Sequence, residues 1–90
     1  MSALTRLARG QECQIRLPGI CNGYPATVVA CHFRLSGLSG IGKKPPDIFC
    51  AWGCSACHAY VDSHKDAETQ LAFAHGCFRT MALLHKRGKL

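Results

Sequence analysis

Cys54-Ser-Ala-Cys57-His58 brings two thiols and an imidazole together within five residues. A Cys-x-x-Cys turn lets two sulfur atoms bind one tetrahedral metal ion from the same side of the chain. We expect the histidine that follows to lie on the first turn of the next element, facing away from the sulfurs. The run favours a zinc-binding turn with an additional functional histidine, and its letters also match the attachment site of a c-type haem.

The chain is short and basic. Its 90 residues correspond to one small domain, residues 1–90, in which a bound metal would add stability to a modest core. Lysine and arginine number 11 and aspartate and glutamate 5, which gives a formal net charge of +6. This charge favours a polyanionic partner, with nucleic acid as the first candidate, although a basic surface also keeps a small protein in solution.

The cysteines indicate a reducing compartment. There are seven of them, an odd number, so they cannot all form intramolecular disulfides. Residues 1–6 lack the apolar segment of a signal peptide, and no run approaches the roughly 18 apolar residues of a membrane span. We therefore expect a cytoplasmic protein without a membrane partner, in which clustered cysteines bind metal or take part in catalysis.

The pattern of apolar and turn residues predicts a small α+β fold. Strands rich in β-branched and aromatic residues are expected at 27–33 and 48–52, and a shorter strand at 14–17. A helical turn is expected at 3–9, and the glycines and prolines of 36–46 predict a loop.

Two helices are expected in the second half of the chain, at 55–63 and 67–87. We expect them to form the core by packing against an antiparallel hairpin. Gly76 interrupts the helical pattern of the second one. The residues at helical spacing on its expected buried face are Leu71, Ala74, Phe78, Met81 and Leu84 or His85.

A structural zinc site needs two further thiolates, and Cys13-x7-Cys21 supplies them upstream. The Pro18-Gly19 turn between these two cysteines allows both sulfurs to lie on one side. The expected zinc ligands are Cys13, Cys21, Cys54 and Cys57. The three other cysteines, Cys31, Cys50 and Cys77, lie in apolar segments and are expected to be small buried side chains.

The haem interpretation would use Cys54 to His58 as the attachment site and Met81 as a second axial ligand. Covalent haem attachment requires export, for which the sequence has no signal. It would also leave Cys13 and Cys21 without a role, so the zinc interpretation is favoured.

A second site is predicted from His58 and Asp62, which are four residues apart and share one face of the 55–63 helix. Together they are suited to bind a divalent ion, with His32 from the preceding strand as a general base for phosphodiester hydrolysis. Other roles stay open: His58 as a zinc ligand or supporting group, His32 as a core residue, and Asp62 as an ion-pair partner of Lys65 or Lys86.

Five runs together resemble a known family: Arg9–Arg16, Pro18–Gly23, His32–Leu35, Lys44–Asp47 and Cys54–His58. Their order resembles the ββα-metal unit of HNH, or His-Me finger, endonucleases. More narrowly, residues 6–62 resemble the YbcO-type nucleases of lambdoid phages and prophages.

The resemblance implies an HNH-like, zinc-stapled domain with an added C-terminal helix. It implies that His32 is the general base, that His58 and Asp62 hold a catalytic Mg²⁺ or another divalent ion, and that the four cysteines hold structural zinc. The chain departs from the HNH pattern in three places. Cys31 stands where an acidic ligand is usual, Asp47 stands near the usual loop Asn, and residues 59–61 lack a Lys or Arg.

We therefore predict a metal-dependent DNA endonuclease. Arg34, Lys43 and Lys44 are the expected phosphate contacts, and phage recombination or replication proteins are candidate partners. The alternative is a non-catalytic zinc module that binds nucleic acid or protein.

Overall fold

The computed structural model describes residues 3–34 and 46–90, so Lys43, Lys44 and most of the expected 36–46 loop lie outside the described residues. The fold is α+β, as predicted. Its elements in order are α1 (Ala3–Arg6), the 3-10 turn η1 (Pro25–Thr27), β1 (Val29–His32), β2 (Cys50–Gly53), α2 (Ser55–Ser63) and α3 (Ala67–Lys86). In the described residues no helix is long and apolar enough to cross a membrane.

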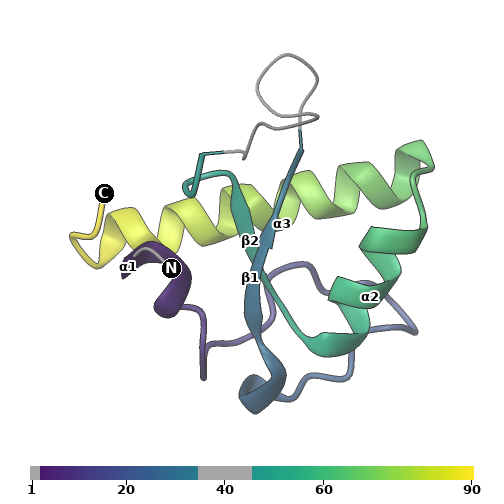
Figure 1. The fold of residues 1–90 in the computed structure, drawn as a ribbon, viewed down its shortest axis with the longest axis horizontal. Coiled ribbons are helices and arrows are strands. Elements are labelled where there is room, and N and C mark those ends of the chain that lie inside the picture. Colours follow the sequence, from purple (N-terminus) through teal and green to yellow (C-terminus); the bar gives the residue numbers. More distant parts are fainter. Residues whose placement is uncertain (1–2, 35–45) are drawn as a thin grey trace.

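The two strands form an antiparallel pair, which confirms the expected hairpin. Val29 pairs with Gly53 at one end and His32 with Cys50 at the other. Figure 1 shows α3 running across one face of this pair and α2 beside it. The sheet is therefore covered by the helices on one side. Just beyond its His32 end, the Phe33 N–H donates a hydrogen bond to the Phe49 carbonyl.

Helix α2 begins where the sequence predicts. Cys54 is its N-cap, and the Cys54 sulfur accepts a hydrogen bond from the backbone N–H of Cys57. Helix α3 is capped in the usual way by Asp66, whose carboxylate accepts from the backbone N–H of Thr69. Both starts are fixed by local residues, which explains why the bounds of these helices could be predicted.

The strand predicted at 14–17 is wrong. Arg16 has a φ of 54°, in the left-handed region, which an extended strand does not allow. The segment crosses the core instead: Ile15 is buried, and the backbone of Gln14 donates to Trp52 and accepts from Arg79. In this bend Gln14, Ile15 and Leu17 are buried and only Arg16 is exposed, so the alternation of polar and apolar residues does not reflect a strand with one buried face.

The buried face of α3 also differs from the prediction. Leu71 and Phe78 are exposed by 57% and 64%, whereas Leu84 is buried as predicted. The buried residues of α3 are Thr69, Phe73, Gly76, Cys77, Thr80 and Leu84. Gly76 favours this face: a Cβ atom there would lie 3.1 Å from the Cα of Ile15 and 3.2 Å from the Cβ of Ala51, closer than ordinary Cβ contacts.

Candidate functional site

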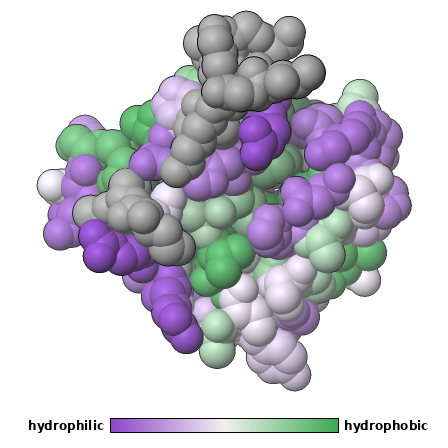
Figure 2. Space-filling model, viewed as in Figure 1, coloured by the Kyte–Doolittle hydropathy of each residue, from purple (hydrophilic) through white to green (hydrophobic). Residues whose placement is uncertain are grey.

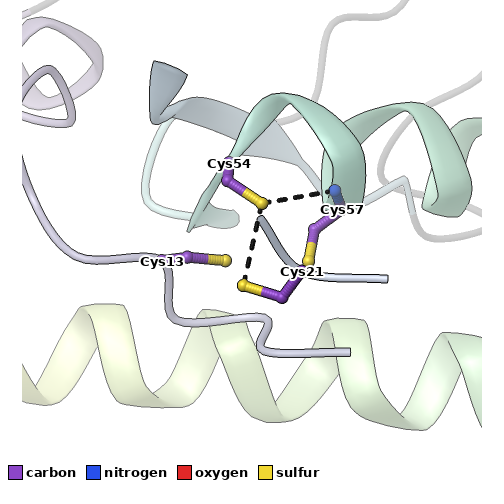
Figure 3. Close-up of side chains that lie close together, drawn as sticks. All are labelled: Cys13, Cys21, Cys54 and Cys57. Carbon is purple, nitrogen blue, oxygen red and sulfur yellow. Dashed lines mark hydrogen bonds between the residues drawn. The ribbon is translucent and has the colours of Figure 1, made fainter. Parts of the chain in front are cut away.

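The four cysteines predicted to bind zinc converge on one point. Cys54 and Cys57 open α2, and Cys13 and Cys21 come from the segment between α1 and η1 (Figure 3). All four sulfur atoms lie within 4.8 Å of one another, and those of Cys21 and Cys54 are 3.8 Å apart. Sulfurs bound to one tetrahedral zinc at ~2.3 Å are separated by about 3.8 Å, so this donor set fits the ion.

A turn brings Cys21 back toward Cys13. The backbone N–H groups of Ile20 and Cys21 both donate to the Leu17 carbonyl, and Gly19 has a φ of 73°. The amide of Asn22 then donates to the Ser55 hydroxyl at the start of α2. The turn expected at Pro18-Gly19 therefore places the upstream sulfurs against the Cys-x-x-Cys turn.

The thiols of this group differ in acidity. Burial by itself would raise the pKa of Cys54, but hydrogen bonds from the backbone of Cys57 and Asn22 and from neighbouring thiols outweigh it and lower this pKa to about 6. Burial raises the pKa of Cys57 and of Cys21. The thiol of Cys54 is therefore more acidic than those of Cys21 and Cys57.

The other three cysteines are buried, as predicted: Cys31 and Cys50 are 1% exposed and Cys77 is 6% exposed. Burial raises the pKa of Cys50 to about 11 and that of Cys77 to about 12. They behave as small apolar side chains in the core.

His32, the last residue of β1, pairs with an acidic side chain. Its Nε2 lies 3.1 Å from Oδ1 of Asp47, and both side chains are partly exposed, at 22% and 28%. An imidazole oriented by a carboxylate and open to solvent is suited to accept a proton on its other ring nitrogen. The sequence signal for Asp47 was its place near the loop Asn of HNH endonucleases, but the sequence did not predict its contact with His32.

His58 and Asp62 form the second pair. Their Nε2 and Oδ2 atoms are 3.4 Å apart, one helical turn from each other on α2, and their side chains are 41% and 68% exposed. Both ligand atoms are therefore accessible to an ion that keeps open positions for water and phosphate oxygens.

The His32–Asp47 and His58–Asp62 pairs do not contact each other, although β1 and α2, which carry the two histidines, pack together. Cys31 faces the core, and the charge of Asp62 contributes to raising its pKa, after burial. His32 emerges from the opposite face of β1, because side chains alternate along a strand. Within residues 3–34 and 46–90, no hydrogen bond or ion pair joins His32 to His58 or Asp62, and the four cysteines form the one group of three or more ligands close enough to share an ion.

Of the expected phosphate contacts, Arg34 lies just after β1 and is exposed. It lies two residues beyond His32, at the same end of the sheet. Lys43 and Lys44 fall outside the described residues.

A family model described as "Putative nuclease YbcO" matches residues 2–89. The chain belongs to the YbcO family. Two curated YbcO proteins, from Escherichia coli strain K12 and from Enterobacteria phage 82, are each 55% identical over 62 residues, which is 69% of this chain. The chain spans 65% of the length of these curated relatives.

The YbcO-family fold also has a solved counterpart. A structure described as that of "a putative bacteriophage protein" from Escherichia coli K-12 is 39% identical, with a TM-score of 0.78. The match covers 93% of this chain and 98% of the other.

Proposed function

We propose that this YbcO-family protein is a metal-dependent DNA endonuclease of the HNH type. The observation that carries the proposal is the partly exposed His32–Asp47 pair at the end of β1. The exposed His58–Asp62 pair lies on α2, and the proposal requires the substrate phosphate to reach both pairs. The nuclease names of the family and of its curated relatives support it. The chain spans 65% of the length of those relatives, so the proposed activity rests on its own residues.

His32 would act as the general base. With Nε2–H donating to Asp47, the Nδ1 atom is free to take a proton from the attacking water, and the carboxylate stabilises the imidazolium that results. His58 and Asp62 would hold Mg²⁺ or another divalent ion. Such an ion supplies Lewis-acid stabilisation of charge on the phosphate and the leaving oxygen.

The four-cysteine site would hold structural zinc, which fixes the start of α2. Since His58 and Asp62 lie on α2, the same ion would fix the position of the catalytic ligands relative to β1. Cys31, in place of the usual acidic ligand, leaves two protein side chains for the catalytic ion.

The test is nicking of supercoiled plasmid with added Mg²⁺ or Mn²⁺. The proposal expects cleavage that is lost in His32→Ala and kept in the matched variant His75→Ala, an exposed histidine of α3. Circular dichroism and zinc content should be unchanged in both. Absence of cleavage of duplex, single-stranded and branched DNA with all divalent ions tried would contradict the proposal.

One observation favours a second candidate, a non-catalytic zinc module for nucleic acid or for phage recombination and replication proteins. In the part of the chain that the structure describes, the four cysteines alone form a group of three or more metal ligands. This candidate expects salt-sensitive DNA binding without turnover, unaffected by His32→Ala.

A further inference from the structure

An open hollow of about 740 Å³ lies beside β1, on the face from which His32 emerges. One wall comes from the N-terminal segment, with Arg6 and Arg9, and the other from η1 and β1. In Figure 2, hydrophobic side chains gather over the middle of this view of the molecule, with hydrophilic ones around them. His32, the proposed base, therefore faces this hollow.

Two arginines carry the charge of this hollow. Arg6 and Arg9 line it together with His32, and none of its lining residues is acidic. Both arginines are exposed, and in residues 3–34 and 46–90 neither forms a hydrogen bond or an ion pair. Other arginines of the chain have structural contacts: Arg79 donates to the Gln14 carbonyl, and Arg87 donates to the Gln11 amide oxygen. The two guanidinium groups in the hollow are thus available to a ligand.

The rest of the lining is small: alanines and valines together with three hydroxyl side chains, Thr5, Thr27 and Ser55. Guanidinium groups bind phosphate oxygens with fork geometry, and a wall of small side chains accommodates the sugar between phosphates. His32 is the one aromatic side chain among the lining residues, so the hollow lacks a row of rings on which unpaired bases could stack. The hollow therefore fits a nucleic-acid backbone.

We infer that this hollow seats the sugar-phosphate backbone of the substrate, with Arg6 and Arg9 binding phosphates beside the one attacked at His32. The inference rests on the proposed function. It adds two phosphate-binding residues to the expected contacts Arg34, Lys43 and Lys44, and implies that the backbone runs along β1 toward the His32 end. Binding through this surface is independent of base sequence.

The test compares two double variants that each remove two positive charges. Arg6→Gln/Arg9→Gln changes the hollow, and Lys86→Gln/Lys89→Gln changes two exposed lysines that do not line it. Binding of a short fluorescent duplex is measured by anisotropy without Mg²⁺ or Mn²⁺, across a range of salt concentrations. The hollow variant should bind about tenfold more weakly, and its slope of log K against log salt should be smaller by about 1.8. The control should keep the slope of the unaltered protein.

Equal binding by the two double variants would overturn the inference, as would no measurable DNA binding by the unaltered protein. If the double arginine variant loses zinc or helical signal, the single variants Arg6→Gln and Arg9→Gln decide the matter, each with an expected loss of about 0.9 in slope. Nicking by His32→Ala is scored separately. Retained nicking there would remove the proposed function without altering the binding result.

Discussion

The Nε2 atom of His32 lies 3.1 Å from Oδ1 of Asp47 at the His32–Cys50 end of the two-stranded sheet. Fifteen residues separate the two in sequence, so the contact depends on the pairing of β1 with β2. It fixes which ring nitrogen of His32 remains available to a water molecule.

Replacing this carboxylate tests its role as a positioning residue. Asp47→Asn removes the charge that stabilises the imidazolium, so we expect nicking to fall by about 10². The plot of kcat against pH should change as well, because the imidazole loses its charged partner. Glu68→Gln, an exposed acid on α3, is the matched control and should nick normally. Unchanged rate and pH profile in Asp47→Asn would exclude a role for Asp47.

Loss of one zinc ligand should unfold the domain. Cys54→Ser removes both a metal ligand and the N-cap sulfur of α2, and a core this small has little reserve of stability. We expect loss of zinc and of helical circular dichroism, whereas Cys77→Ala, at a buried cysteine outside the group, should keep one zinc per chain. A helical signal that persists after complete removal of metal would contradict the zinc assignment.

The acidity of the cysteine group predicts the direction of pH dependence. The pKa of Cys54 is lowered to about 6 in the folded chain, below its ordinary value of 9.0. Its thiolate therefore stabilises the fold fully above the unfolded pKa, and this contribution is lost as the pH falls through about 6. The raised pKa values of Cys21 and Cys57 act in the same direction on metal binding, because these thiols must lose protons to bind the ion.

The measurement is zinc release to a chromophoric chelator at a series of pH values. Release should be slow at neutral pH and should become faster as the pH falls, because protons compete with the ion for the thiolates. A release rate independent of pH across this range would be inconsistent with thiolate ligands.

Gly76 should not tolerate a methyl group. A Cβ atom there would lie 3.1 Å from both Cα and Cγ1 of Ile15, and the Cα atom cannot move without the backbone. We expect Gly76→Ala to lower the free energy of urea unfolding by about 1–2 kcal/mol, although alanine is the better helix former by about 1 kcal/mol. Ala82→Gly, at an exposed position of α3, measures the helix propensity alone. A more stable Gly76→Ala protein would mean that α3 packs less closely than described.

Local signals account for what could be predicted. The Cys-x-x-Cys turn determines the start of α2, and the paired strands follow from their β-branched and aromatic residues. The zinc group was found because cysteine pairs are rare outside such sites, and its sulfurs do converge. These features depend on residues that are close in sequence, or on cysteines, whose clustering commonly indicates a metal site.

What could not be predicted depends on tertiary contact. Ile15 is buried in a bend between Gly53 and Gly76, so neither the conformation of residues 14–17 nor the buried face of α3 follows from local spacing. The His32–Asp47 contact and the hollow lined by Arg6 and Arg9 likewise require β1 to be placed against distant segments. Helical periodicity pointed to Leu71 and Phe78, which are exposed, because the pattern counts large apolar side chains. It gives no weight to a glycine that packs against the core.

The central claim is that His32 and the His58–Asp62 pair act on one phosphate. The most direct measurement is anomalous diffraction from crystals of the protein grown with Mn²⁺ and an uncleaved DNA duplex. The account predicts a manganese peak bound by His58 and Asp62, with a phosphate oxygen on the ion and His32 facing the same phosphorus. A phosphate bound at His32 with no ion at His58 and Asp62, or an ion there with His32 facing elsewhere, would contradict it.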